Sequence, residues 1–354
     1  MRRNTRTIYV GKVAIGGNSP VSVQSMTNTD TRDVKATVAQ ILALEKAGCE
    51  IVRLAVIDAE AVEALIKIKA QVSVPLIADI HFDYRLALQS MENGIDALRI
   101  NPGNIGGSNR VKKVVELAKV KNIPIRIGVN AGSLEKELLQ KYQGVTPEAL
   151  VESALNHVTL LEKESFTDIK ISVKASHIPL MLAAYRLLAE KVDYPFHIGV
   201  TEAGTYQRGV IKSAVGIGAL LAEGIGDTLR VSLTGDPIRE IKPGYEILRA
   251  LNLRCVGPEI ISCPTCGRTQ VALEKIALQI EAEVEKMSIT KPLKIAVMGC
   301  VVNGPGEARE ADIGIAGGIG EGLIFKHGKV IKKVNEDQLL QVFLQELHKL
   351  LEEE

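Results

Sequence analysis

Short runs rich in valine and isoleucine alternate with longer amphipathic stretches along roughly the first two thirds of the chain. Eight such runs predict β-strands at residues 20–25, 50–55, 74–79, 97–101, 123–129, 168–173, 196–200 and 228–233. Apolar residues spaced for one face of a helix predict α-helices between them, over 34–47, 59–70, 110–121, 147–163, 179–190 and 210–221. Eight strand–helix units are typical of a (β/α)8 TIM barrel, and a count of eight argues against a doubly wound open sheet.

Elements of a different kind flank this repeat. Residues 7–10 and 12–15, followed by two glycines, predict a small hairpin that plugs the floor of the barrel. Residues 238–251 predict the eighth helix, with its first turn disturbed by Pro243 and Gly244. The pattern then becomes that of an α+β fold, with helices over 269–287 and 336–352 and strands near 293–299, 311–316, 323–326 and 329–334. The sequence therefore predicts an α/β protein of two domains, a barrel over residues 1–255 and a smaller domain over 256–354.

The composition limits the possible functions. The chain has 354 residues, of which 46% are hydrophobic but only 3% aromatic, so we expect an aliphatic core. Its net charge of +1 gives no reason to expect nucleic-acid binding. No apolar run approaches the roughly 20 residues of a membrane span, and none follows the basic start as it would in a secretory signal. Five cysteines, an odd number, indicate thiols or metal ligands in the cytoplasm and not a disulfide framework.

A group of cysteines near the C-terminus indicates a metal site. Cys263 and Cys266 form a CxxC pair, and Cys300 follows at the end of a predicted strand. Glu307 comes just after a tight Gly-Pro-Gly turn and is the candidate for a fourth, weaker ligand. An incomplete zinc site and a [4Fe–4S] cluster with one special iron both fit three thiolates and a carboxylate, because the ligands alone do not decide the metal.

The predicted strands carry an unusual number of cations near their carboxyl ends, where TIM-barrel enzymes bind their substrates. Five positive side chains come from or follow five different strands, namely Arg53, Arg99, Arg126, Lys174 and Arg230. The polar residues that we single out beside them are Asp79, His81, Asn101, Asn104, Asn130, Ser172, Thr201, Glu202, Ser232 and Thr234. Because the whole chain is nearly neutral, this concentration predicts a substrate with several negative charges, most simply a diphosphate. His81 and Glu202 are the candidate proton carriers.

The order of the elements bears on how the two sites meet. The eighth strand ends at the top of the barrel, and the eighth helix then carries the chain about 20 Å back toward the bottom. The chain therefore enters the metal domain from the bottom of the barrel, the face opposite to the one that carries the cations. If the two sites cooperate, a head-to-tail homodimer with composite active sites brings them together.

Three motifs resemble those of the 4-hydroxy-3-methylbut-2-enyl diphosphate synthases, the GcpE or IspG family of the non-mevalonate route to isoprenoids. They are Val21-Ser-Val-Gln-Ser-Met-Thr27, Cys263-Pro-Thr-Cys266-Gly267-Arg268 and Val297-Met-Gly-Cys300-Val-Val-Asn303-Gly-Pro-Gly306-Glu307. The resemblance covers the whole chain and matches the two-domain bacterial form. It implies an oxidoreductase with a substrate-binding TIM barrel and a [4Fe–4S] cluster held by Cys263, Cys266, Cys300 and Glu307.

The same resemblance implies a substrate, a reaction and roles for several residues. The substrate would be 2-C-methyl-D-erythritol 2,4-cyclodiphosphate, opened by a two-electron reduction with loss of water. Flavodoxin or ferredoxin would deliver the electrons singly. The positions that match the family's diphosphate-binding residues are Arg53, Arg99, Arg126, Lys174, Arg230 and Ser232. Glu202 matches the acid/base carboxylate, and Asn303 matches a substrate contact beside the cluster.

Two other functions are compatible with the residues taken alone. One is a zinc-dependent barrel enzyme that acts on a phosphorylated sugar without redox chemistry. The other is a barrel joined to an electron-transfer or binding module with which it shares no active site. That second function predicts that Glu307 can be replaced without loss of turnover.

Overall fold

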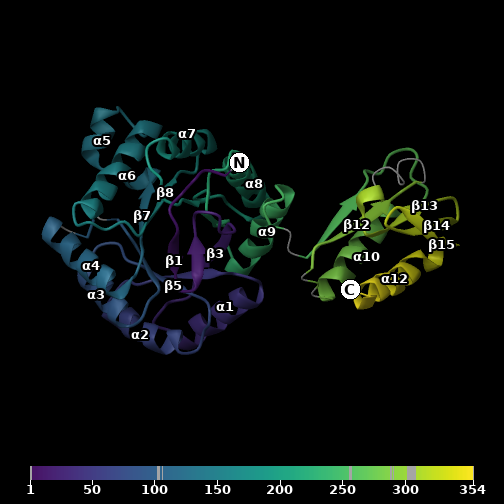
Figure 1. Ribbon diagram of the computed structural model, residues 1–354, viewed down its shortest axis with the longest axis horizontal. Helices are drawn as coiled ribbons and strands as arrows, with labels where there is room; N and C mark the ends of the chain where they lie inside the picture. The colour runs from purple at the N-terminus through teal and green to yellow at the C-terminus, as the bar shows by residue number, and fades with distance from the viewer. Residues whose placement is uncertain are drawn as a thin grey trace. The chain divides into compact units, whose positions relative to one another are not determined.

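The computed structural model describes residues 2–101, 104, 105, 107–254, 257–287, 289, 291–300 and 308–353. The chain divides into two compact units, Met1–Arg254 and Cys255–Glu354, which are drawn in purple to green and in green to yellow in Figure 1. Each unit has its own apolar core, built almost entirely from aliphatic side chains.

Eight parallel strands form the centre of the first unit. They are β3 (Ser22–Met26), β4 (Ile51–Ala55), β5 (Leu76–Asp79), β6 (Ala97–Ile100), β7 (Ile125–Asn130), β8 (Ile169–Lys174), β9 (His197–Ile198) and β10 (Thr228–Leu229). Their order in the sheet is β8-β7-β6-β5-β4-β3-β10-β9. A parallel bridge between Ile171 and Phe196, with the Ile171 amide donating to the Pro195 carbonyl at 3.0 Å, joins the two edge strands. The sheet is therefore a closed barrel, as the eight runs predicted.

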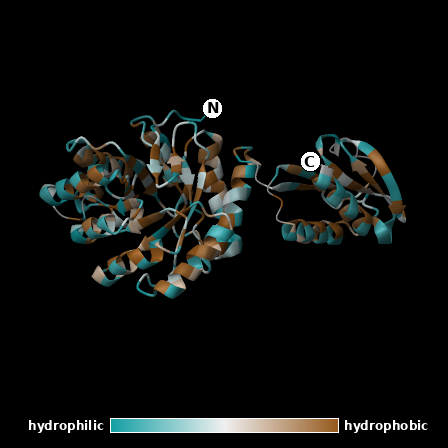
Figure 2. Ribbon diagram, turned by 60° about the horizontal axis from the view of Figure 1, so that its bottom comes forward, coloured by the Kyte–Doolittle hydropathy of each residue, from teal (hydrophilic) through white to brown (hydrophobic). Residues whose placement is uncertain are grey.

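Helices surround this barrel (Figure 1). They are α1 (Val34–Lys46), α2 (Ala59–Lys69), α3 (Tyr84–Glu92), α4 (Ser108–Lys121), α5 (Lys136–Lys141), α6 (Pro147–Glu162), α7 (Ile178–Ala189), α8 (Tyr206–Ala222) and α9 (Ile241–Ala250), with short 3-10 turns η1 (Ala131–Ser133) and η2 (Pro237–Glu240). Figure 2 shows hydrophobic and hydrophilic residues alternating along them, which suits helices that bury one face. No helix in the described parts of the chain is both long and apolar enough to cross a membrane.

The predicted helix over 238–251 is divided in the structure. Residues Pro237–Glu240 form η2, and α9 begins at Ile241. Pro243 thus falls in the first turn of α9, where its missing N–H leaves no internal hydrogen bond unmade. The division matters for the site because η2 brings Glu240 into the barrel, where its carboxylate accepts from Arg230.

The N-terminal hairpin closes the floor of the barrel, as predicted. Strands β1 (Ile8–Val10) and β2 (Val13–Ile15) pair antiparallel. Their buried side chains form one apolar cluster with Ile51, Ile77 and Ala97, which lie at or near the amino ends of β4, β5 and β6. The opposite, carboxyl ends of the strands are left for the site.

The second unit is a two-layer α+β fold. Its sheet has the order β11 (Pro258–Ser262), β12 (Leu293–Met298), β13 (Ile313–Gly317), β14 (Glu321–Lys326) and β15 (Lys329–Asn335). The first three strands are parallel and the last three antiparallel. Helices α10 (Leu273–Lys286) and α12 (Leu339–Glu353) contribute to the main core of the sheet, and short 3-10 turns η3 (Ala308–Glu310) and η4 (Glu336–Gln338) complete the unit. Strand β11 was not predicted.

Candidate functional site

A cavity of about 210 Å³ lies in the barrel unit and is lined by charged and polar side chains. Its lining residues are Arg53, Asp79, His81, Arg99, Arg126, Asn130, Lys174, Thr201, Arg230 and Ser232. All five cations singled out from the sequence, together with His81, Asn130, Thr201 and Ser232, therefore meet in one place. Asp79, also singled out from the sequence, adds a carboxylate to the lining.

Strand register explains why residues far apart in the sequence converge. Asp79 is paired with Arg99, and Arg99 with Arg126, on three neighbouring strands. Asn130 is paired with Lys174 at the carboxyl ends of β7 and β8. Arg53 and Arg126 lie inside their strands and not at the ends, which corrects the sequence-based placement. Both nevertheless line the cavity, because a guanidinium on a long stem reaches it from a lower position in the barrel.

Asp79 holds two of the guanidinium groups. Its carboxylate is 95% buried and lies 3.0 Å from Arg99 Nη1 and 3.5 Å from Arg53 Nη1. Burial alone would raise the pKa of Asp79, but the neighbouring Arg53, His81 and Arg99 outweigh it and hold that pKa well below its usual range. Gly128 on β7 leaves room for Arg99, since a Cβ there would lie 2.5 Å from Arg99 Nε. The two cations are therefore fixed before any ligand binds.

Glu240 holds a third cation in the same way. Its two carboxylate oxygens accept from Arg230 Nε at 3.0 Å and Arg230 Nη2 at 3.1 Å. They also accept from Ser25 Oγ at 2.8 Å and from the Leu233 amide at 3.0 Å. Only 2% of the Glu240 side chain is exposed. Nothing in the sequence marks Glu240 as a buried residue, because a glutamate in a predicted helix is expected to be exposed.

Two cations, Arg126 and Lys174, make no hydrogen bond or ion pair with a carboxylate within the described parts of the chain. Arg126 donates through Nε and Nη2 to Ser172 Oγ, at 3.2 and 3.0 Å. The Lys174 amine lies 3.2 Å from His197 Nε2. Burial, followed by the charges of neighbouring arginines, lowers the pKa of both Arg126 and Lys174 well below their ordinary values. Burial likewise lowers the pKa of Arg53, to about 10, although Asp79 opposes it. These directions are those expected where buried positive charge outweighs negative charge.

The candidate proton carriers, His81 and Glu202, lie in different surroundings. His81 lies at the mouth of the cavity, with 54% of its side chain exposed and Nε2 at 3.2 Å from Arg99 Nη1 and 3.5 Å from Asp79 Oδ1. Glu202 follows Thr201 in the loop between β9 and α8 and has a left-handed backbone with φ of 52°. Glu202 is exposed and is not among the residues that line the cavity. Asn303, expected beside the cluster, lies outside the described residues.

Two of the cysteines follow adjacent parallel strands of the second unit. Cys263 comes directly after β11, and Cys300 comes two residues after β12. The Cys263 sulfur accepts a hydrogen bond from the Gly299 amide at 3.2 Å. A backbone hydrogen bond from Arg268 lowers the pKa of Cys266, which is exposed. Amide donors of this kind favour thiolates and are typical around iron–sulfur clusters, so these donors fit such a group.

The described residues do not include the whole expected ligand set of the metal site. Glu307, the expected fourth ligand, lies outside the described residues. Across the ranges that are described, no three Cys, His, Asp or Glu side chains are grouped closely enough to hold a metal ion. The identity of a bound group therefore rests on the chemistry of the donors and not on their present geometry.

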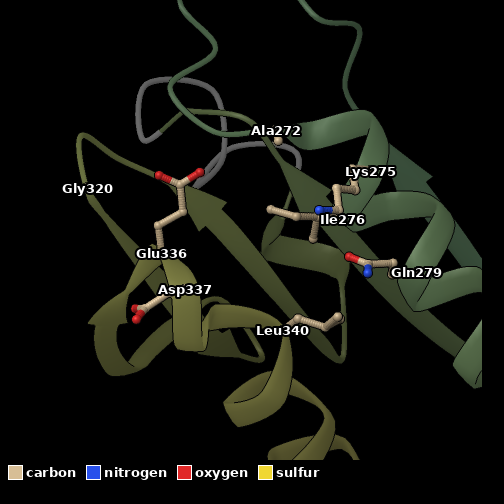
Figure 3. Close-up of a pocket in the computed structure, with 8 residues that line it drawn as sticks. All are labelled: Ala272, Lys275, Ile276, Gln279, Gly320, Glu336, Asp337 and Leu340. Atoms are coloured by element: carbon tan, nitrogen blue, oxygen red, sulfur yellow. The ribbon is translucent and has the colours of Figure 1, made fainter.

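A larger hollow, of about 650 Å³, lies on the second unit between α10 and the segment that leads into α12 (Figure 3). Its walls carry Glu336 and Asp337 on one side and Lys275 and Gln279 on α10. Charges of both signs and three apolar side chains give this hollow no preference for an anion. The smaller barrel cavity, where five cations converge, is the better candidate for a binding site.

These features define a class of protein: a TIM-barrel enzyme with a cationic cavity near the carboxyl ends of its strands, joined to an α+β unit with cysteines at strand ends. The sequence matches the GcpE TIM-barrel domain over residues 5–245 and the GcpE protein C-terminal domain over residues 259–349. The chain belongs to the GcpE family. The family predicted from the three motifs is thereby confirmed.

Close relatives span the whole chain. A 4-hydroxy-3-methylbut-2-en-1-yl diphosphate synthase (flavodoxin) of Caldanaerobacter subterraneus subsp. tengcongensis is 61% identical over 354 residues, covering 100% of this chain and 99% of the relative. The protein of the same name from Geobacter sulfurreducens is 60% identical over 353 residues, with 100% and 99% covered.

Among solved structures, two unrelated enzymes share the barrel fold alone. An N-acetylneuraminic acid synthetase of Leptospira borgpetersenii aligns with a TM-score of 0.50 at 14% identity, over 70% of this chain and 90% of its own. A dihydropteroate synthase of Stenotrophomonas maltophilia aligns with a TM-score of 0.50 at 10% identity, over 70% and 98%. These two likenesses support the fold and say nothing about the substrate.

Proposed function

We propose that this protein is an oxidoreductase that converts 2-C-methyl-D-erythritol 2,4-cyclodiphosphate to 4-hydroxy-3-methylbut-2-enyl diphosphate. The observation that carries the proposal is the cavity in which five cations meet, in a chain about 60% identical along its length to synthases of that product. A diphosphate is the simplest substrate that several guanidinium groups can bind through paired hydrogen bonds. Family membership favours this reaction over that of a zinc-dependent sugar phosphate enzyme.

The cavity residues would bind and orient the substrate. Arg53, Arg99 and Arg230 are held in place by Asp79 and Glu240, so their guanidinium groups need little reorganisation when phosphate oxygens arrive. Opening the cyclic diphosphate leaves additional negative charge on the phosphate that departs from carbon. The cations that line the cavity would stabilise this charge as it forms, in a site where little water screens them.

We propose that proton transfer falls to Glu202 and His81. The conversion takes up two electrons and one net proton and releases one water molecule. We assign the proton to Glu202 because it directly follows Thr201, which lines the cavity, and because an exposed carboxyl can exchange protons with solvent. His81 contacts Asp79 and Arg99, so it orients those groups and can relay a proton to the same place.

The second unit would hold the redox group. Cys263, Cys266, Cys300 and Glu307 are the proposed ligands of a [4Fe–4S] cluster, and Asn303 is the proposed substrate contact beside it. When bound, such a cluster supplies electrons one at a time and a Lewis-acidic iron at the position of its weakest ligand. The Gly299 amide that donates to Cys263 supports this assignment. Residues 1–255 would then be the substrate-binding domain and residues 256–354 the cluster domain.

A reduced flavodoxin or ferredoxin is the proposed electron donor, and the names of the relatives specify flavodoxin for those proteins. We propose that the reaction takes place in the cytoplasm, where free thiols persist. Substrate and donor are thus a small anionic molecule and a redox protein, with no role for nucleic acid or membrane.

We also propose a head-to-tail homodimer with composite active sites. The last described residue of the barrel unit, Arg254, donates to the Val21 carbonyl at 3.2 Å and lies 2.7 Å from Glu50. Both partners directly precede β3 and β4, at the amino ends of these strands. The chain therefore leaves the barrel on the face opposite to the cavity. A second chain, arranged head to tail, is the simplest source of cysteines for that cavity.

The function is tested by anaerobic reconstitution with iron and sulfide, followed by turnover of the cyclodiphosphate with a reduced flavodoxin. We expect a brown protein that forms the linear diphosphate and contains about four irons per chain. A colourless protein with one zinc and no turnover would contradict the proposal. Turnover that survives Glu307→Ala would support instead a barrel whose attached module shares no active site with it.

Mixed dimers test the composite site. One chain carries Lys174→Met in the cavity, and the other carries Cys300→Ser in the second unit, with different affinity tags for purification of the mixed species. Each parent should be inactive. If the sites combine two chains, one site of the mixed dimer is intact and turnover returns to about half that of the unchanged dimer. Recovery of no activity would place both halves of the site on one chain.

A further inference from the structure

Lys174 differs from the other cations of the cavity in the partner that it contacts. It is the last residue of β8, is 94% buried, and has its amine 3.2 Å from His197 Nε2. Arg53 and Arg99 each lie within 3.5 Å of Asp79, and Arg230 lies 3.0 Å from Glu240. Lys174 therefore contacts a neutral ring where three of its neighbours contact carboxylates.

An ammonium group in this position is unfavourable while the cavity is empty. Removing a charge from water without a partner costs several kcal/mol, and an amine avoids that cost by losing its proton. A guanidinium cannot do so, because its intrinsic affinity for the proton is too high. Burial, and after it the charges of Arg126, Arg53, Arg230 and Arg99, lower the pKa of Lys174 well below its ordinary value. The amine is thus the one group among the five whose charge can change.

His197 can accept a hydrogen bond from Lys174 whether or not the lysine is protonated. Its ring is fully buried, and burial, followed by Arg126, Lys174 and Lys170, lowers its pKa well below the ordinary value. A neutral ring can accept at Nε2 from an amine and from an ammonium alike. Tyr185 Oη donates to the His197 carbonyl at 2.7 Å, which fixes the backbone of this short strand. At Gly199 a Cβ would lie 3.0 Å from the Lys174 amine, so the glycine leaves that amine its space.

Cations dominate the surroundings of the pair. The titratable and charged groups that act on Lys174 and His197, drawn from β4, β6, β7, β8, α7 and the segment after β10, are Arg53, Arg99, Arg126, Lys170, Tyr185 and Arg230. Among the described residues, the carboxylates that form ion pairs with these guanidinium groups are Asp79 and Glu240. The four guanidinium groups of the cavity and the two carboxylates paired with three of them sum to a net charge of +2 when Lys174 is neutral. With Lys174 protonated, the net charge becomes +3.

From this arrangement we infer that Lys174 and His197 form a proton-accepting pair that raises the positive charge of the cavity by one when a trianionic diphosphate occupies it. The inference rests on the proposed function, because the cyclic substrate is a dianion and its open-chain product can carry a third negative charge. With an uncharged amine, the net charge of +2 in the site balances the charge of the dianion. With an ammonium group that donates a hydrogen bond to His197 Nε2, the net charge of +3 balances the charge of the trianion. The proton comes from solvent, and no bond to carbon or phosphorus is made or broken by the pair.

Proton uptake on ligand binding tests the inference without any turnover. Inorganic pyrophosphate is titrated into the full-length protein by calorimetry, in two buffers with different ionisation enthalpies at one pH. Lys174→Arg keeps a positive charge that cannot be lost, and the pyrophosphate contributes the same protons to both titrations. We expect the wild-type protein to take up about one proton more per pyrophosphate than Lys174→Arg does. The ratio of the two dissociation constants should then change by up to about tenfold per pH unit.

Matched variants identify the group that takes up the additional proton. Lys170 is a second buried lysine on β8 but does not line the cavity, so Lys170→Met should keep the additional uptake. His197→Leu, which removes the acceptor, should reduce it. If Lys174→Arg fails to fold as judged by circular dichroism, Lys174→Met takes its place, since it also lacks a titrating amine. Equal uptake in the wild-type protein and the Lys174 variant, or loss of uptake in Lys170→Met instead, would overturn the inference.

The two proposals can fail separately. Turnover of the cyclodiphosphate decides the proposed function and does not depend on the proton count. Proton uptake with pyrophosphate decides the role of Lys174 and His197 and needs neither the cluster nor an electron donor.

Discussion

Replacing Glu240 by glutamine should destabilise the barrel unit strongly, although the side chain keeps its size. Each Glu240 oxygen accepts two hydrogen bonds, one from Arg230 and one from either Ser25 or the Leu233 amide. An amide nitrogen in place of either oxygen would face two donors and remove the charge that offsets Arg230. Hydrogen bonds to charged groups contribute about 1.5–3 kcal/mol each, and breaking a buried ion pair costs about 3–5 kcal/mol. Because 15% of the Arg230 side chain is exposed, we expect the lower end, about 3 kcal/mol.

Urea unfolding followed by circular dichroism measures this difference, and α9 offers a matched control. Glu246 accepts from Arg249 three residues further along the helix, but 48% of its side chain is exposed. Glu246→Gln should therefore cost no more than about 0.5 kcal/mol. Glu240→Gln should also weaken pyrophosphate binding, because Arg230 loses the contact that orients it. An unfolding free energy for Glu240→Gln within about 0.5 kcal/mol of that for Glu246→Gln would refute the reasoning.

Three further predictions concern other parts of the molecule. Because the pKa of Asp79 is depressed in the folded protein, its ionised form adds stability that is fully present above the unfolded pKa of about 4 and is lost as the pH falls below it. The stability gap between wild-type protein and Asp79→Asn should thus shrink between pH 7 and pH 3 in thermal unfolding, and an unchanged gap would contradict this account. Ile15→Ala, at a fully buried site under the barrel, should cost about 2–5 kcal/mol in urea unfolding, whereas Tyr9→Ala, at a side chain 61% exposed on the same hairpin, should cost well under 1 kcal/mol. Glu202→Gln should cut turnover of the cyclodiphosphate by about a hundredfold or more while iron content and pyrophosphate affinity stay unchanged; normal turnover would exclude Glu202 as the proton carrier.

Much of the barrel was predictable because its signals are local. Strands buried on both faces read as runs of valine and isoleucine, and the eight runs recur with helices between them. Strand β11 was missed because it opens with Pro258 and its residues are only partly buried, so it has no clear apolar run. Its existence follows from pairing with β12, which is a tertiary contact.

The site was predictable in its cations but not in the residues that control them. Glu240 gives no sign in the sequence of its burial, which comes from η2 packing onto the barrel. His197 falls within a predicted strand and has no motif around it. One usable signal was present in β8, where Lys170, Ser172 and Lys174 occupy every second position between isoleucine and valine. A polar series of period two in a strand that is buried throughout marks the barrel interior, and its last member lines the cavity.

The partners of the cations divide the cavity into two sides. On β4, β6 and the segment after β10, guanidinium groups face Asp79 or Glu240, so much of their charge is already offset and their positions are fixed. On β7 and β8, Arg126 faces Ser172 and Lys174 faces His197, and neither partner is a carboxylate. The electrostatic field that attracts an anion is therefore strongest beside β7 and β8. On the other side, where carboxylates offset the guanidinium charges, the arginines mainly fix the orientation of the ligand. A ligand whose charge grows during the reaction is best placed with its growing charge toward the uncompensated side. That is also the side on which an amine, and not a guanidinium, can adjust the charge of the site.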